Sequence, residues 1–256
     1  MTRGRWFSLL AALALAAALA LLALPLLALL LQTSPAALAR SLGEPSARDA
    51  LWLSLRTTTI ALAVILAVGT PAAWLLATQR FRGRAVVVTL VELPLVLPPA
   101  VAGIALLATF GRDGLLGGAV DVVFTTPAVV IAVTFVAAPF YVRGAQAAFA
   151  AVDRTLLEAS RTLGAGEART FAAVAVPAAL PGLVAGGALA FGRALGEFGA
   201  TLMFAGSLQD VTQTVPLAVY SRLATDFDEA VALSVVLVAA SAAILAAVKL
   251  VVDARD

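Results

Sequence analysis

Long, nearly uncharged apolar segments recur along this chain, and they limit its possible folds more than any other feature. Each reaches or approaches the roughly 20 residues that a membrane-crossing helix needs. Only 12% of the 256 residues are charged and 62% are hydrophobic, whereas about 25% of the residues in a soluble domain are charged. The chain therefore cannot cover a globular surface with polar groups. We predict an all-α polytopic membrane protein that forms a single transmembrane domain over residues 1–256. The predicted spans are 6–31, 51–78, 85–110, 125–142, 171–198 and 229–252.

The first apolar segment allows two interpretations. Arg3 and Arg5 precede it and small residues follow near 36–39, as in a secretory signal peptide. Its apolar run is about 25 residues long, whereas the apolar core of a signal peptide has roughly 7–15. The length favours a retained membrane span.

Basic residues are unevenly distributed between the two sides of the predicted membrane. With the N-terminus inside, eleven of the seventeen lie in inside segments, four lie outside, and Arg56 and Arg193 lie within spans. Cytoplasmic loops are enriched in Lys and Arg, so we predict a multi-pass protein of the cytoplasmic (inner) membrane with both termini in the cytoplasm. The inside residues are Arg3, Arg5, Arg80, Arg82, Arg84, Arg143, Arg154, Arg161, Arg169, Lys249 and Arg255, and the outside residues are Arg40, Arg48, Arg112 and Arg222.

The composition argues against several functions. The chain has no histidine and no cysteine, which removes thiol chemistry and the commonest transition-metal ligands, so we predict no metal site and no catalytic residue. Lys249 is the only lysine, so a Ser/Lys pair for an intramembrane enzyme is not evident. The scattered basic residues do not suggest nucleic-acid binding. An intramembrane enzyme and an uncoupled channel remain as alternatives to a transporter subunit.

The polar stretch between the fourth and fifth spans, residues 143–170, is the most distinctive local feature. Thr155 and Glu158 have the spacing of a capping box, in which the threonine is the N-cap, and Gly164 supplies a left-handed helix stop. The helix between them has about two turns and is too short to be stable alone. Ala159 and Ser160 are small and allow a partner surface to approach closely. The alternative is a helix that only connects two spans.

Two ionisable residues and three threonines mark the outer end of the fifth span and the loop that follows. Arg193 and Glu197 are one helical turn apart and share a face, and ionisable groups within spans are costly and usually functional. They either neutralise each other and serve packing, or line a path. Arg193 is the candidate charge complement for an anion, unless Glu197 already neutralises it. Thr201, Thr212 and Thr214 are further candidates near that path.

The third span contains three prolines within 94–99, which should distort its helix. Glu92 lies in the same span. It could extend towards Arg82 or Arg84, or it could face a water-filled cavity.

The polar stretch resembles a known motif. Residues 158–164, EASRTLG, and 174–177, VAVP, have the spacing of the "EAA" loop in membrane subunits of ATP-binding-cassette (ABC) importers, E-A-A-x3-G-x9-I-x-L-P. The departures are serine for the second alanine and valines for isoleucine and leucine. In that family the loop forms the coupling helix, which sits in a cleft of the ATP-hydrolysing subunit. The residues implied for this contact are Glu158, Ala159, Ser160 and Gly164.

Further segments resemble the molybdate branch of the oxyanion importers, which is close to the tungstate and sulfate permeases. They are 93–103 (LPLVLPPAVAG), 191–207 (FGRALGEFGATLMFAGS) and 212–220 (TQTVPLAVY), and the resemblance covers roughly residues 50–250. It implies a type I ABC importer permease fold, a homodimer, two ATP-binding subunits on the cytoplasmic side and an extracytoplasmic substrate-binding protein. The expected function is molybdate import by alternating access, with tungstate or sulfate/thiosulfate as alternatives. The chain has no G-x-x-x-x-G-K-[ST] loop, so no cofactor is expected on it directly, and ATP and Mg belong to the partner ATPase.

Overall fold

The computed structural model of the chain describes residues 3–117 and 119–253, and every regular element in this part of the chain is helical. The helices are α1 (Arg3–Gln32), α2 (Pro35–Gly43), α3 (Pro45–Thr78), α4 (Arg84–Val96), α5 (Pro99–Phe110), α6 (Thr126–Ala150), α7 (Arg154–Thr162), α8 (Glu167–Thr170), the π-helical turn η1 (Phe171–Ala175), α9 (Val176–Leu195), α10 (Gly199–Ala205), α11 (Val215–Leu223) and α12 (Phe227–Asp253). The predicted all-α fold class is confirmed.

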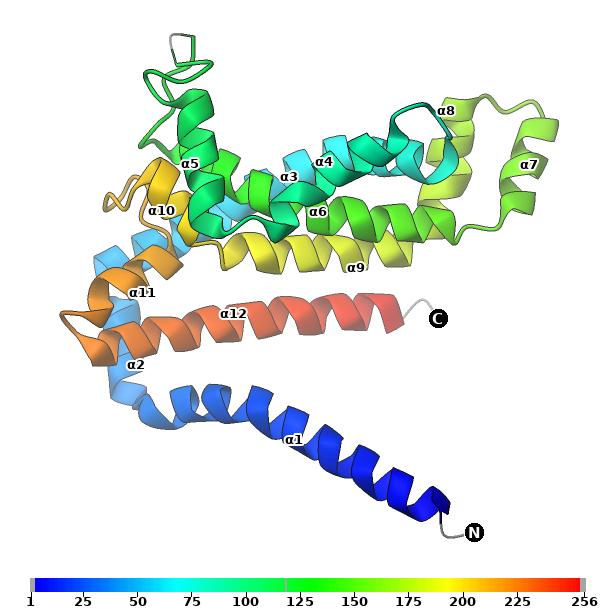
Figure 1. Cartoon of the computed structure of the whole chain (residues 1–256). Coiled ribbons are helices and arrows are strands. Elements are labelled where there is room, and N and C mark those ends of the chain that lie inside the picture. The colour runs from blue at the N-terminus through cyan, green and yellow to red at the C-terminus, as the bar shows by residue number, and fades with distance from the viewer. Residues whose placement is uncertain (1–2, 118, 254–256) are drawn as a thin grey trace.

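The long helices α1, α3, α4, α6, α9 and α12 run in alternating directions along the molecule (Figure 1). Within the described residues, five helical segments are long and apolar enough to cross a membrane, and the bent pair of α4 and α5 is a sixth candidate. The start of α1 and the end of α12 lie at the same end of the molecule as α7 (Figure 1). The termini themselves, residues 1–2 and 254–256, lie outside the described residues.

The prediction of one continuous helix over 85–110 is wrong. The chain forms α4 and α5, whose axes differ by 118°, with Leu97 and Pro98 extended between them. A residue before a proline is disfavoured in the helical region, and two successive prolines impose this on both Leu97 and Pro98. Pro99 then occupies the first turn of α5, where its missing N–H group is harmless.

Other predicted boundaries differ from those observed. Helix α3 begins at Pro45 rather than 51 and α6 continues to Ala150 rather than 142, so the predicted loop 143–170 begins as helix. The fifth span is helical from Glu167 to Leu195 because α8, η1 and α9 follow one another without a gap. In η1 the Val176 N–H group donates to the Phe171 carbonyl, five residues back.

The core lies between α3, α6 and α9, where small residues allow close approach. A Cβ atom added at Gly69 on α3 would lie 2.9 Å from the Tyr141 ring on α6, and one added at Gly182 on α9 would lie 2.5 Å from Ala148 Cβ. The Tyr141 hydroxyl is 2.7 Å from Thr70 Oγ1, which satisfies a polar group among apolar side chains. This packing fixes the three helices that carry the candidate sites at their two ends.

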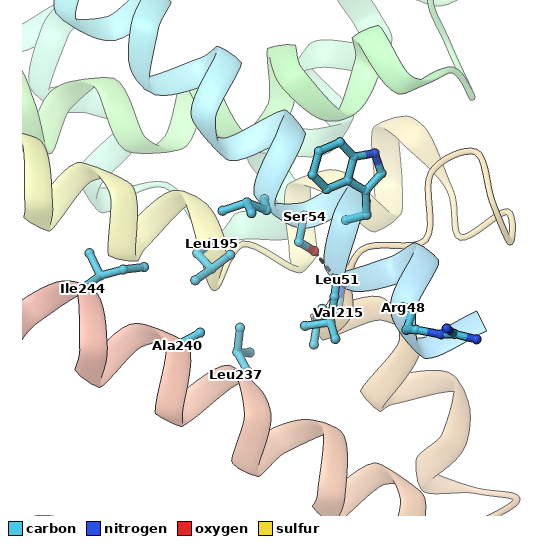
Figure 2. A pocket seen from close by; sticks show the side chains of 10 residues that line it. Arg48, Leu51, Ser54, Leu195, Val215, Leu237, Ala240 and Ile244 are labelled. Atoms are coloured by element: carbon cyan, nitrogen blue, oxygen red, sulfur yellow. Dashed lines mark hydrogen bonds between the residues drawn. The ribbon is translucent and has the colours of Figure 1, made fainter. Parts of the chain in front are cut away.

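Two parts of the molecule pack loosely on this core. In α1 no residue of the apolar span is buried by the rest of the chain, so the helix meets its surroundings on all sides. Between α12 and the α3–α9 pair lies a cavity of about 330 Å³ with mainly apolar lining, including Leu195, Leu237 and Ile244 (Figure 2). Helix α12 is therefore held mainly by its N-terminal half, where its buried residues lie between 230 and 235.

Candidate functional site

The coupling segment, which we define as residues 151–170 between α6 and η1, stands at one end of the molecule (Figure 1). Its helix α7 begins after Asp153, whose Oδ1 accepts a hydrogen bond from the Thr155 N–H group at 2.9 Å. This hydrogen bond holds the pKa of the Asp153 carboxyl below its usual range. The predicted capping box with Thr155 as N-cap is therefore wrong, because an aspartate two residues earlier caps the helix equally well.

Gly164 ends α7 as predicted. It has φ +82°, its N–H group donates to the Arg161 carbonyl, and the next N–H group, of Ala165, donates to the Ser160 carbonyl. These bonds satisfy carbonyls that a helix C-terminus otherwise leaves free. The left-handed stop inferred from the sequence is confirmed.

Side-chain contacts fasten α7 to α8. Ser160 Oγ lies 3.0 Å from Thr170 Oγ1. Arg161 forms a two-point ion pair with Glu167, with Nε 2.8 Å from Oε1 and Nη2 3.2 Å from Oε2. The small Ser160 thus faces its own chain as well as any partner, and α7 is held to the start of the fifth span.

Two hollows flank α7. The first, of about 410 Å³, has a largely apolar wall that includes Leu156, Leu163 and Val174, and the Leu163 side chain is 88% exposed. The second, of about 430 Å³, is lined by polar residues that include Arg80 from the α3–α4 connection and Glu158. Neither Leu163 nor Arg80 was predicted from the sequence to lie beside α7. Residue 80 is far from α7 in sequence, and no local pattern connects the two.

At the opposite end of the molecule, Arg193 and Glu197 meet where α9 gives way to α10. Arg193 Nη2 lies 2.6 Å from Glu197 Oε2, and Glu197 is 1% exposed while Arg193 is 28% exposed. Glu197 Oε1 accepts a hydrogen bond from the Ala200 N–H group at 2.8 Å. The helical spacing predicted this pair, and Glu197 does neutralise Arg193.

The three candidate threonines are buried. Thr212 Oγ1 accepts a hydrogen bond from the Leu208 N–H group, so it shapes its own loop. Thr201 and Thr214 are buried, and no hydrogen-bond partner for their hydroxyls is found among the described residues. In this conformation none of the three offers an exposed polar surface.

Ser54 is a further buried polar residue that the sequence analysis missed. Its Oγ, on α3, accepts a hydrogen bond from the Val215 N–H group at 2.8 Å and so caps α11 (Figure 2). The contact joins residues 161 positions apart. No local pattern marks such a serine, which looks like any polar residue within a span.

Glu92 has a different partner from those expected. Its Oε1 lies 2.5 Å from Arg143 Nη1, which ties α4 to α6. Arg84, one of the two expected partners, donates instead to the Leu76 carbonyl. The pairing with Arg82 or Arg84 is therefore wrong, because α6 brings a nearer cation to the same depth.

Comparisons with known proteins agree with this architecture. The molybdenum transport system permease protein ModB of Mycobacterium bovis is 41% identical over 234 residues, which is 90% of this chain and 89% of that protein. ModB of Escherichia coli K12 is 39% identical over 69% of this chain and 80% of that protein. A probable molybdenum ABC transporter permease of Haloferax volcanii is 42% identical over 84% of this chain and 79% of that protein.

Solved structures share the fold at lower sequence identity. A bacterial ABC transporter involved in the import of the acidic polysaccharide alginate aligns with a TM-score of 0.76 at 16% identity, over 98% of this chain and 96% of that one. An inward-facing conformation of the MetNI methionine ABC transporter aligns with a TM-score of 0.65 at 22% identity, over 80% of this chain and 94% of that one. The fold is that of type I ABC importer permeases.

A family model described as "binding-protein-dependent transport system inner membrane component" matches residues 69–256. The match begins within α3 and includes the coupling segment and the Arg193–Glu197 pair. The chain belongs to this family of ABC transporter permeases.

Proposed function

We propose that this protein is the membrane-spanning subunit of an ATP-driven importer that moves molybdate across the cytoplasmic membrane by alternating access. The observation that carries the proposal is the 41% identity over 90% of the chain to a permease named for molybdenum transport. Tungstate and sulfate or thiosulfate are the alternative substrates, since they are dianions of similar shape.

The chain supplies the path, and we propose that separate subunits supply ATP hydrolysis and substrate capture. The proposed complex contains two copies of this chain, two ATP-binding subunits that hold ATP and Mg on the cytoplasmic side, and an extracytoplasmic binding protein. The coupling segment supports the contact with the ATPase because α7 projects at one end and has hollows on both sides. The proposed contact residues are Glu158, Ala159, Ser160 and Gly164.

We further propose that the coupling segment and both termini face the cytoplasm. The eleven-to-four distribution of basic residues supports this orientation. The alternating helices, which bring the ends of α1 and α12 to the side of α7, support it as well (Figure 1).

The outer end of the path is proposed to lie where α9, α10 and the following loop meet. The residues proposed there are Arg193, Glu197, Thr201, Thr212 and Thr214. Because Glu197 neutralises Arg193, a lone cation that attracts the anion is not part of the proposal. Weak interaction suits this role, since tight binding within the membrane would slow release.

Uptake by a reconstituted complex tests the proposal. The chain is placed in vesicles with its ATPase and binding protein, and uptake of labelled molybdate is measured with and without ATP. We expect ATP-dependent uptake, with unlabelled tungstate and sulfate as competitors that define selectivity. ATP-dependent uptake of sulfate but not molybdate would select the alternative substrate, and uptake without ATP would indicate a channel.

A further inference from the structure

We propose that Arg193 and Glu197 are positioning residues that clasp α9 to α10 and hold the paired helices α5 and α10 at the outer end of the path. The relevance to transport rests on the proposed function, whereas the clasp itself is a property of the chain. The term clasp means the Arg193–Glu197 ion pair together with the hydrogen bond from the Ala200 N–H group to Glu197.

The two carboxylate oxygens of Glu197 reach opposite sides of a break in the helix. Oε2 meets the guanidinium of Arg193, in the last turn of α9. Oε1 accepts from the N–H group of Ala200, in the first turn of α10. Gly196 and Phe198 flank Glu197 outside both helices. One side chain therefore sets the angle between the two helices.

Helix α10 in turn is packed too closely on α5 for the two to move independently. A Cβ atom added at Gly103 on α5 would lie 2.5 Å from Met203 Cβ on α10, and one added at Gly199 on α10 would lie 2.6 Å from Pro99 Cβ on α5. The rings of Phe110 and Phe204 add an aromatic contact, with centroids 5.9 Å apart. Any change in the direction of α10 must carry α5 with it.

The α5–α10 pair is joined to α4 and α9 through two breaks, and to α6 and α11 through the chain segments 111–125 and 206–214. Thr126 Oγ1, at the start of α6, donates to the Val211 carbonyl in the second of these segments. Of the two breaks, only the one between α9 and α10 is clasped. Among the described residues, no side-chain hydrogen bond or ion pair crosses the α4–α5 break at 97–98. Helix α10 also packs on α6, and its Phe204 and Ala205 belong to the same buried cluster as residues of α6. Glu197 is thus the side chain that bridges the break between α9 and α10, and we assign the angle of the pair to it.

The chemistry of the pair favours positioning over contact with the anion. A buried carboxylate beside the path repels a dianion, and Arg193 is already neutralised. Ionisable pairs within a membrane span are expensive compared with apolar residues of the same size, and they specify one geometry in return. A pair that served packing alone would be replaceable by apolar side chains without effect on transport.

Distance measurements within one chain test the clasp. The chain has no cysteine, so spin labels can be placed at Ala178→Cys on α9 and at Ala105→Cys on α5, which are both exposed positions. Because α5 is packed on α10, the distance between the two labels reports the angle of the pair. The labelled chain is diluted with unlabelled chain in the complete complex in lipid nanodiscs. We expect a narrow distance distribution with the native pair and with Arg193→Lys, and a broadened or shifted one with Glu197→Gln.

Two further variants keep this test decisive. If Glu197→Gln does not assemble, the double variant Arg193→Gln/Glu197→Gln leaves no buried lone charge and should show the same broadening. Arg143→Gln, which breaks the Glu92–Arg143 pair elsewhere in the spans, is the matched control and should leave the distance unchanged. Native-like distributions in both Glu197→Gln and the double variant would overturn the clasp.

Transport kinetics provide a readout that a purely structural role does not move. We expect Glu197→Gln to lower maximal uptake on the order of tenfold, with unchanged apparent substrate affinity and continued ATP hydrolysis, so that more ATP is used per anion. Wild-type uptake despite a broadened distance would overturn the positioning role. A loss of affinity at unchanged maximal rate would show that the pair contacts the anion. If the unmodified complex does not transport molybdate, the proposed function fails while the distance test still stands.

Discussion

Single residues set the ends of the helices that matter most here. Gly164 occupies the left-handed region with φ +82°, and no atom lies within 4 Å of the position that a Cβ atom would take. A side chain at this position is therefore disfavoured by the backbone alone. Gly166 is equally unobstructed but has an ordinary negative φ of −68°. A comparison of the two glycines therefore distinguishes the effect of backbone conformation from that of steric crowding.

We expect Gly164→Val to disturb the end of α7 and weaken coupling to the ATPase while the spans remain inserted. A left-handed conformation costs a residue with a Cβ roughly 1–2 kcal/mol, and more for a β-branched side chain. ATPase co-purification and molybdate uptake measure the effect, and Gly166→Val is the matched control with little expected change. Assembly and transport at the wild-type rate in Gly164→Val would contradict the role of the coupling segment.

The residue scale also shows the limits of prediction from sequence. The Arg193–Glu197 pair and the Gly164 stop were predictable because both depend on spacing within one helix. The cap by Ser54 and the pairing of Glu92 with Arg143 depend on which helices pack together, so they were not. Asp153 and Thr155 are both good N-caps, and only the backbone path decides between them.

The positions of the long helices were largely predictable from the sequence, whereas the geometry of the breaks between helices was not. Apolar length identified the spans, and the three prolines within 94–99 indicated a distortion. Beyond the 118° bend, α5 packs on α10, and that helix lies about one hundred positions further along the chain. The contact between α5 and α10 depends on glycines that leave no room for a Cβ atom.

We expect Gly103→Ala to push α5 away from α10, because the new Cβ would lie 2.5 Å from Met203 Cβ and 2.9 Å from the Ala200 carbonyl oxygen. Overpacking of this kind costs about 1–3 kcal/mol, which a thermal unfolding measurement in detergent should detect. Gly192→Ala on α9, with nothing within 4 Å, is the control. Equal melting temperatures for the two variants would mean that the α5–α10 contact yields easily.

At the scale of the whole molecule, the structure shows which helix ends lie at the same end of the molecule. Alternating helices bring the start of α1, the end of α12 and the coupling segment to one end of the molecule, and the Arg193–Glu197 pair to the other (Figure 1). Helix counting predicted this arrangement from sequence, because it depends on the number of crossings and not on their packing. Which end faces the cytoplasm stays a prediction from the distribution of basic residues.

We expect a cysteine at position 2 to resist a membrane-impermeant thiol reagent in intact cells, and a cysteine at Gln209, in the exposed part of the outer loop, to react. Both should react after the cells are opened, which controls for accessibility. The reverse pattern in intact cells would overturn the topology and the placement of the coupling segment with it.

The unbroken helix from Glu167 to Leu195 has a mechanical consequence. Its 29 residues span about 43 Å, with α7 fastened at one end and the clasp at the other. If the segment tilts as one body, a rotation of about 10° moves its far tip by about 7 Å. Such a tilt would carry a displacement at α7 to the clasp at the other end of the molecule without a relay of side-chain contacts.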